Sequence, residues 1–220
     1  MKPLVVAIDG PSGAGKSTAG RALAAHLGYL FIDTGAMYRA LALKAMRAGI
    51  DSGAELALAG LLQASRIELR DGGRQVLLDG EDVTFPIRAR EVSAAASRVS
   101  VHPAVRREMV ARQREFGRDG GVVLDGRDIG TAVFPDADVK FYVDADVQHR
   151  AERRLRELAA TGISAELGAI EQEIRERDHA DMTRSDSPLT RAADAVLLDT
   201  TELTPAQVLE RMLEVVSSRV

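Results

Sequence analysis

The stretch from Gly10 to Ser17 has the residue types and spacing of a phosphate-binding loop. It contains GPSGAGKS, so it satisfies the pattern G-x-x-x-x-G-K-[ST], and it lies between an apolar, strand-like run and a helical pattern. Glycines let main-chain N–H groups turn inward around phosphate oxygens, and the following helix directs its positive end at the same anion. Lys16 adds a charge over the β- and γ-phosphates, and the Ser17 hydroxyl is suited to Mg²⁺. The expected contacts to a nucleoside triphosphate are Gly10, Pro11, Ser12, Gly13, Ala14, Gly15, Lys16, Ser17 and Thr18.

A second group of polar residues follows the next apolar run. The segment DTGAMYR places Thr34, Tyr38 and Arg39 just beyond the carboxyl end of an expected strand. Two hydroxyls and a guanidinium in such a place can hold the phosphate of an acceptor molecule. Tyr38 has the alternative of packing its ring on the sheet. A guanine-binding switch would carry an N-K-x-D segment, which this sequence lacks, so a small-molecule kinase is favoured.

The third apolar run ends in the segment DGRD. Asp125 at the strand end is suited to hold Mg²⁺ through water, although strand-end aspartates also cap the turns that follow them. The glycine after it lets the main chain approach a ligand closely, so Arg127 can bridge the acceptor and the transferring phosphate.

A charged segment near the carboxyl end of the chain is expected to form exposed helices. Arg177, Asp181 and Arg184 are four and three residues apart, which places them on one helix face. Such a face is either a solvated set of ion pairs or part of a lid that brings positive charge to a triphosphate. Arg150 and Arg154, also four apart, are candidates to contact ATP from the base of that lid.

The elements that position these residues alternate between strands and helices. Five short apolar runs each end in an aspartate, at residues 4–9, 30–33, 122–125, 139–144 and 195–199. This alternation predicts a doubly wound α/β sheet with parallel strands, whose ligands bind beyond the carboxyl ends of the strands. One interruption, residues 66–85, has the turn signals of an antiparallel hairpin.

Composition limits the function further. The chain has 220 residues, a formal net charge of -4, no cysteine and no apolar run long enough to span a membrane. These properties predict a cytoplasmic protein without disulfides, thiolate metal sites, a membrane partner or a general affinity for nucleic acid, and we expect a monomer. The four histidines are scattered without ligand spacing.

Four segments together resemble the bacterial cytidylate kinase family, a member of the nucleoside monophosphate kinases. They are DGPSGAGKST, DTGAMYRAL, DGRDIGT and RERDHAD followed by an arginine, and the resemblance extends over essentially the whole chain. It implies one P-loop kinase domain over residues 1–220, with a parallel five-stranded sheet flanked by helices. It also implies a monophosphate-binding insert at about 63–91, containing the antiparallel hairpin, and a helical lid at about 154–188.

The resemblance implies a reaction and roles for individual residues. The reaction is transfer of the γ-phosphoryl group of MgATP to CMP, and to dCMP, with Lys16 and Arg127 among the catalytic cations. Asp128 would accept from the cytosine amine and Asp181 from the ribose 2′-hydroxyl. Ser97, which would otherwise be a small packing residue, also joins the base contacts. The implied CMP contacts are Thr34, Tyr38, Arg39, Ser97, Arg106, Arg127, Asp128, Arg177, Asp181 and Arg184, and the implied catalytic cations are Lys16, Arg39, Arg127, Arg177 and Arg184.

Two other functions use the same phosphate-binding loop. One is a P-loop kinase for a different small acceptor, of the UMP or shikimate type. The other is a non-catalytic module in which ATP orders loops for a partner protein. A panel of acceptors assayed with ATP separates these possibilities, because only a kinase releases ADP in response to its acceptor.

Overall fold

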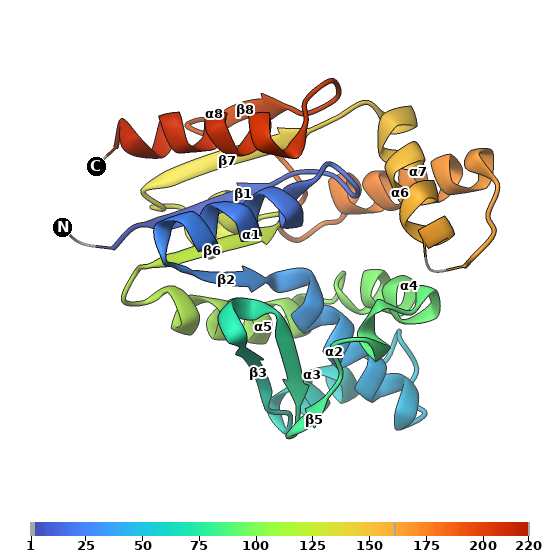
Figure 1. Ribbon diagram of the computed structural model, residues 1–220. Helices are drawn as coiled ribbons and strands as arrows, with labels where there is room; N and C mark the ends of the chain where they lie inside the picture. The colour runs from blue at the N-terminus through green and yellow to red at the C-terminus, as the bar shows by residue number, and fades with distance from the viewer. Residues whose placement is uncertain (1–2, 161, 220) are drawn as a thin grey trace.

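The computed structural model describes residues 3–160 and 162–219. Its centre is a five-stranded sheet with the order β2-β6-β1-β7-β8, in which every neighbouring pair is parallel (Figure 1). The strands are β1 (Val5–Asp9), β2 (Leu30–Asp33), β6 (Val122–Gly126), β7 (Val139–Asp144) and β8 (Val196–Asp199). The parallel α/β sheet expected from the five apolar runs is confirmed.

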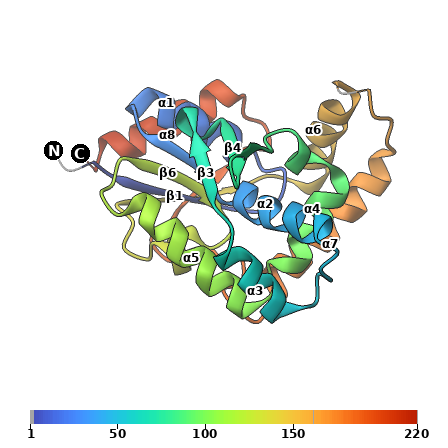
Figure 2. The same cartoon turned by 90° about the horizontal axis from the view of Figure 1, so that it is seen from below.

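Helices cover both faces of this sheet (Figure 2). Successive residues of β1 point to opposite faces, so Val6 and Ile8 join one apolar core and Ala7 joins the other. The first core is completed by α1 (Lys16–Leu27) and α8 (Pro205–Ser217), and the second by α2 (Thr34–Arg47), α3 (Glu55–Gln63), α4 (Arg90–Val99) and α5 (Pro103–Gly117). Burial on both faces explains why the strands are continuous apolar runs.

The interruption between α3 and α4 forms a small antiparallel sheet. Its strands are β3 (Ile67–Arg70), β4 (Gln75–Leu78) and β5 (Glu81–Asp82), so the expected hairpin is extended by a third short strand. The short helical turns η1 (Asp71–Gly73) and η2 (Pro86–Arg88) complete this insert. Arg21 on α1 donates to the Gly73 carbonyl over 2.9 Å, and Gly73 lies so close to strand β2 that a Cβ there would be 2.0 Å from the Phe31 carbonyl oxygen.

Two further helices extend beyond the carboxyl ends of the strands, where Figure 1 shows them beside the phosphate-binding loop. They are α6 (Val147–Ala160) and α7 (Leu167–Thr183), and they share a small apolar cluster of their own. A single π-helical turn, η3 (Ile129–Val133), follows β6. No helix in the described part of the chain is long and apolar enough to cross a membrane.

Candidate active site

The phosphate-binding loop connects β1 to α1. Gly10, Gly13 and Gly15 have φ values of 146°, 78° and 91°, a region that side chains with a Cβ rarely adopt. Gly10 has a second reason to be glycine, because a Cβ there would lie 1.9 Å from the main-chain oxygen of Val143 on β7. Since α1 begins at Lys16, the N-terminal end of this helix points at the space enclosed by the loop.

Lys16 lies at the base of this loop. Its side chain is 6% exposed, and its Nζ donates to the Pro11 carbonyl over 2.6 Å. The pKa of Lys16 is lowered to about 7, first by burial and then by the neighbouring Arg127 guanidinium, while the Asp125 carboxylate acts in the opposite direction. A phosphate placed in the loop would favour the ammonium form, so this lysine is ready to gain charge when an anion binds.

Ser17 and Asp125 form a pair that fits a hydrated divalent cation. The Ser17 hydroxyl donates to Asp125 Oδ2 over 2.5 Å, and the carboxylate is buried at the end of β6. Burial raises the pKa of Asp125 to about 6, with a further contribution from the nearby carboxylate of Asp33. Among the described residues no group of three His, Cys, Asp or Glu could hold a metal, so a cation here would need phosphate and water oxygens as additional ligands.

The start of α2 carries the residues expected to hold an acceptor phosphate, and it meets the phosphate-binding loop at Asp125. The space between the loop and the start of α2 is called the cleft below. Asp33 caps this helix by accepting from the Ala36 N–H over 2.8 Å and also receives Arg39 Nη2 over 3.0 Å. Burial raises the pKa of Asp33, but the Arg39 and Arg21 guanidiniums and the cap hydrogen bond outweigh it, so the pKa lies below its usual value. Thr34 donates to the Asp125 carbonyl over 2.7 Å, which joins α2 to the end of β6.

A second group of charges surrounds Asp128, beside the same cleft. Its Oδ2 is ion-paired with the guanidinium of Arg106, whose side chain is 2% exposed, and its Oδ1 lies 3.5 Å from Arg184 Nη2. Arg106 also donates to the Ser100 carbonyl over 3.1 Å, and its guanidinium carbon lies 6.0 Å from the centre of the Tyr38 ring. Burial raises the pKa of Tyr38 to about 12, which keeps this phenol neutral.

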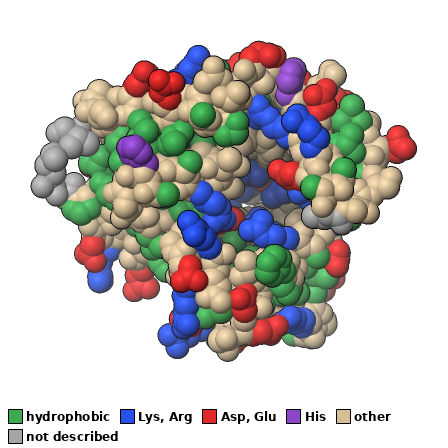
Figure 3. Space-filling view, in the orientation of Figure 1, with side chains coloured by type: hydrophobic (Ala, Val, Ile, Leu, Met, Phe, Trp, Pro, Cys, Tyr) green, Lys and Arg blue, Asp and Glu red, His purple; other side chains and the backbone are tan. Residues whose placement is uncertain are grey.

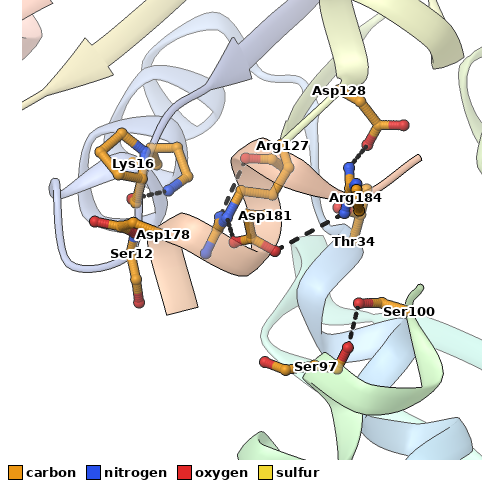
Figure 4. A network of polar contacts seen from close by, with 12 residues as sticks. Ser12, Lys16, Thr34, Ser97, Ser100, Arg127, Asp128, Asp178, Asp181 and Arg184 are labelled. Atoms are coloured by element: carbon orange, nitrogen blue, oxygen red, sulfur yellow. Dashed lines mark hydrogen bonds and ion pairs between the residues drawn. The ribbon is translucent and has the colours of Figure 1, made fainter. Parts of the chain in front are cut away.

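The face of α7 that points into the cleft carries the charges expected from their spacing (Figure 4). Asp181 Oδ2 accepts from Arg127 Nε over 2.7 Å, and Asp181 Oδ1 lies 3.9 Å from Arg184 Nη1. Arg177 Nε is buried without a hydrogen-bond partner, and burial together with the repulsion of Arg127 lowers the pKa of Arg177 to about 10. In the space-filling view, Lys and Arg side chains surround a hollow in the middle of the face that is shown (Figure 3). The cluster can therefore accept further anions.

The helical pair contacts the phosphate-binding loop directly. Arg150 Nη1 donates to Asp178 Oδ2 over 2.5 Å and to the Ser12 carbonyl over 2.8 Å, while the Ser12 N–H donates to Asp178 Oδ1 over 3.0 Å. Arg150 and Arg154 were both expected at the base of the helical lid, and the structure brings Arg150 to the phosphate-binding loop. Arg154 is 43% exposed and paired with Glu157 over 3.1 Å.

Sequence reasoning missed several polar residues of this site. Thr200, after β8, donates to the Ala14 carbonyl of the loop over 2.9 Å and accepts from Arg153 Nη1 over 3.1 Å. Asp9, at the end of β1, is buried and accepts two main-chain N–H groups of η3, and burial raises its pKa to about 6. The sequence signal that could have identified Thr200 and Asp9 is their position at or just beyond the carboxyl end of an expected strand. Ser97 lies on α4, with its hydroxyl 3.5 Å from the Ser93 carbonyl.

A phosphate-binding loop facing a second cationic pocket, on a parallel sheet of this order, defines a P-loop kinase. A solved structure of the same fold is shikimate kinase from Acinetobacter baumannii in complex with shikimate, which is 16% identical with a TM-score of 0.51 and covers 98% of this chain and 94% of that chain. A sequence model named cytidylate kinase matches residues 6–218. The cytidylate kinases of Symbiobacterium thermophilum and Solibacter usitatus are 51% and 52% identical, cover 96% and 100% of this chain, and are each covered over 95% of their length. The chain belongs to the cytidylate kinase family.

Proposed function

We propose that this protein is a cytidylate kinase that transfers the γ-phosphoryl group of ATP to CMP, and to dCMP, to give ADP and the diphosphate. Family membership supports the reaction class. The observation that carries the proposal is the meeting of two anion sites in one cleft. Lys16 and the loop amides form the donor side, and the acceptor side has Arg39 and Arg177, whose buried Nε atoms have no hydrogen-bond partner.

Phosphoryl transfer needs positioned cations more than it needs a base. The acceptor phosphate is already an anion at neutral pH, and the transition state spreads charge over the equatorial oxygens of the transferring group. Lys16 and Arg127 are assigned to the donor side of this cleft and Arg39 to the acceptor side, while Arg177 on α7 and Arg184, directly after α7, supply the remaining cations. The unpartnered Nε of Arg177 is a donor that a phosphate oxygen would satisfy.

Ser17 and Asp125 are the residues that would hold Mg²⁺, with Asp125 acting through water. When bound, the ion neutralises charge that develops on the β- and γ-phosphates. The Ser17 hydroxyl and the Asp125 carboxylate themselves orient this edge of the loop through their shared hydrogen bond.

Recognition of cytosine is assigned to Asp128, together with Arg106 and Ser97. A carboxylate can accept from the exocyclic amine of cytosine, whereas uracil presents a carbonyl oxygen at that position and leaves two acceptors facing each other. The ion pairs to Arg106 and Arg184 hold the Asp128 carboxylate in place. Asp181 is assigned to the ribose 2′-hydroxyl, and Thr34 and Tyr38, with Arg39, to the CMP phosphate.

The surrounding segments would exclude water from the reaction. The insert at about 63–91 and the lid at about 154–188 are proposed to close on the bound nucleotides, since water otherwise competes as the phosphoryl acceptor. Arg150 is assigned to the donor nucleotide through its contact with the loop, and Arg154 is retained as a lid contact that forms on closure. We further propose that the protein works as a cytoplasmic monomer.

The test is ADP release with CMP, dCMP, UMP and AMP compared side by side at saturating MgATP. We expect release with CMP and dCMP to exceed release with UMP and AMP. Asp128→Ala should reduce the ratio of kcat/KM for CMP over UMP, because the residue that separates the two bases is lost. Slow ADP release that is the same with and without acceptors would instead indicate an ATP-dependent binding module.

A further inference from the structure

Asp9 makes two contacts that the proposed reaction does not explain. It is the last residue of β1, directly before the phosphate-binding loop, and it is 4% exposed. Its Oδ1 accepts from the Ile129 N–H and its Oδ2 from the Gly130 N–H, each over 2.7 Å. Both carboxylate oxygens are thus used on a segment about 120 residues away in the chain.

These two N–H groups lie at the start of η3, where main-chain donors have no acceptor within the turn itself. The first main-chain N–H groups of a helical turn have no acceptor within the turn, and a side chain usually caps them. The residue at the capping position is Asp128, which is one of the residue types that most often caps its own helix, yet its side chain makes no such bond. Asp9 supplies the missing acceptors from the neighbouring strand.

Because Asp9 caps η3, the side chain of Asp128 is available for a different role. Its carboxylate points at Arg106 and Arg184 instead of at the N–H groups beside it. The site is also built for close approach, because a Cβ on Gly130 would lie 3.3 Å from Asp9 Oδ2 and 3.1 Å from Lys140 Cδ. The side chain of Asp128 would have local donors to bond if Asp9 withdrew from them.

We infer that Asp9 is a positioning residue for base selection: by capping η3 in place of Asp128, it holds the Asp128 carboxylate in the acceptor pocket. This inference rests on the proposed function. It adds that Asp9, which lies on β1 and is distant in the sequence from the residues assigned to the base, affects the preference for cytosine without contacting the base itself.

The experiment is a double-mutant cycle with Asp9→Asn and Asp128→Ala, read out as the ratio of kcat/KM for CMP over UMP at saturating MgATP. Asp9→Asn keeps the shape but turns one acceptor into a donor that opposes an N–H group. We expect it to lower the ratio by about tenfold, the effect of one hydrogen bond to a charged group. In the Asp128→Ala background it should change the ratio less than twofold, because no carboxylate remains to be misdirected.

Asp138→Asn is the matched control. Like Asp9, Asp138 accepts a main-chain N–H over 2.7 Å, but its donor is Val5, at the opposite end of β1 from Asp9. We expect this variant to leave the CMP over UMP ratio unchanged, whatever it does to the melting temperature.

Two results would overturn the inference: a CMP over UMP ratio in Asp9→Asn within twofold of the parent protein, or an equal effect of this change with and without Asp128. If the parent protein releases no ADP in response to CMP, the proposed function itself fails, which is a separate outcome. Should Asp9→Asn not fold, Gly130→Ala weakens the same contact while keeping the carboxylate, and it should lower the ratio in the same direction. No change in the ratio for folded Gly130→Ala would then contradict the inference.

Discussion

Removal of the Asp128 carboxylate is expected to cost stability as well as selectivity. Asp128→Ala leaves the Arg106 guanidinium, 2% exposed, without its main counter-ion. The groups that remain near Arg106 are the Ser100 carbonyl at 3.1 Å and Asp186 at 4.0 Å. Breaking a buried ion pair by removing one partner costs about 3–5 kcal/mol, because the other charge stays buried and unpaired. The free energy of unfolding should fall by this amount.

The assay is urea unfolding of the nucleotide-free protein, with the melting temperature as a second measure. For a chain of this size, a loss of 3–5 kcal/mol corresponds to roughly 6–20 °C. The variant should unfold with an unchanged m-value, since the surface exposed on unfolding is the same.

A second variant separates two contributions to the loss of stability: the buried, unpaired charge of Arg106 and the lost packing of the Asp128 side chain. Arg106→Leu combined with Asp128→Ala removes both charges, and replacing a buried pair by apolar groups is often neutral or stabilising. We expect the double variant to recover at least about 2 kcal/mol relative to Asp128→Ala. A single variant within about 1 kcal/mol of the parent protein, or a double variant no more stable than the single, would refute the reasoning.

Three further predictions concern the phosphate-binding loop. Lys16→Ala should abolish phosphoryl transfer, and near-normal turnover in a coupled ADP assay would contradict the role assigned to Lys16. Burial lowers the pKa of Lys16 from 10.5 to about 7, so the folded chain binds fewer protons than the unfolded chain between these values and this group makes stability rise with pH there. Bound ATP should raise the pKa of Lys16, so ATP binding at pH 8 should take up protons, which calorimetry in buffers of different ionisation enthalpy measures. The Lys16→Arg variant should lose this proton uptake. Equal uptake by both proteins would exclude Lys16 as its source. Gly10→Ala places a Cβ 1.9 Å from the Val143 main-chain oxygen and should abolish ATP binding. The control is Gly28→Ala, where φ is 69° and the added Cβ meets open space; it should cost about 1–2 kcal/mol of unfolding free energy and leave ATP affinity unchanged. Intact ATP binding by Gly10→Ala would refute the argument that the loop needs Gly10 close to Val143.

The sequence predicted the central sheet and the loop because both follow from local patterns. Apolar runs ending in aspartate indicate buried parallel strands, and the spacing of glycines and Lys16 needs a particular backbone path. The turn signals of residues 66–85 predicted antiparallel strands there, but they did not define β5 (Glu81–Asp82), because two exposed acidic residues carry no alternation. A strand this short forms only because β4 lies beside it.

The site residues that escaped prediction depend on tertiary contacts. Asp9 resembles the other aspartates at strand ends, and its partners lie about 120 residues away, so its role could not be read from its neighbours in the sequence. The spacing of Arg150 and Arg154 favoured both, but the direction in which α6 leaves the sheet brings Arg150 to Ser12 and Arg153 to Thr200. Helical spacing identifies a shared face but not which members of it reach a neighbour.

The way the small antiparallel sheet is attached has a consequence for solubility. β2 is the outermost strand on one side of the central sheet, and such a strand carries unpaired main-chain groups to which another chain can add. Gly73 lies against the Phe31 carbonyl of this strand, and Arg21 holds it there. The insert thus shields the margin of the sheet, so a shortened protein without residues 67–88 would self-associate along β2.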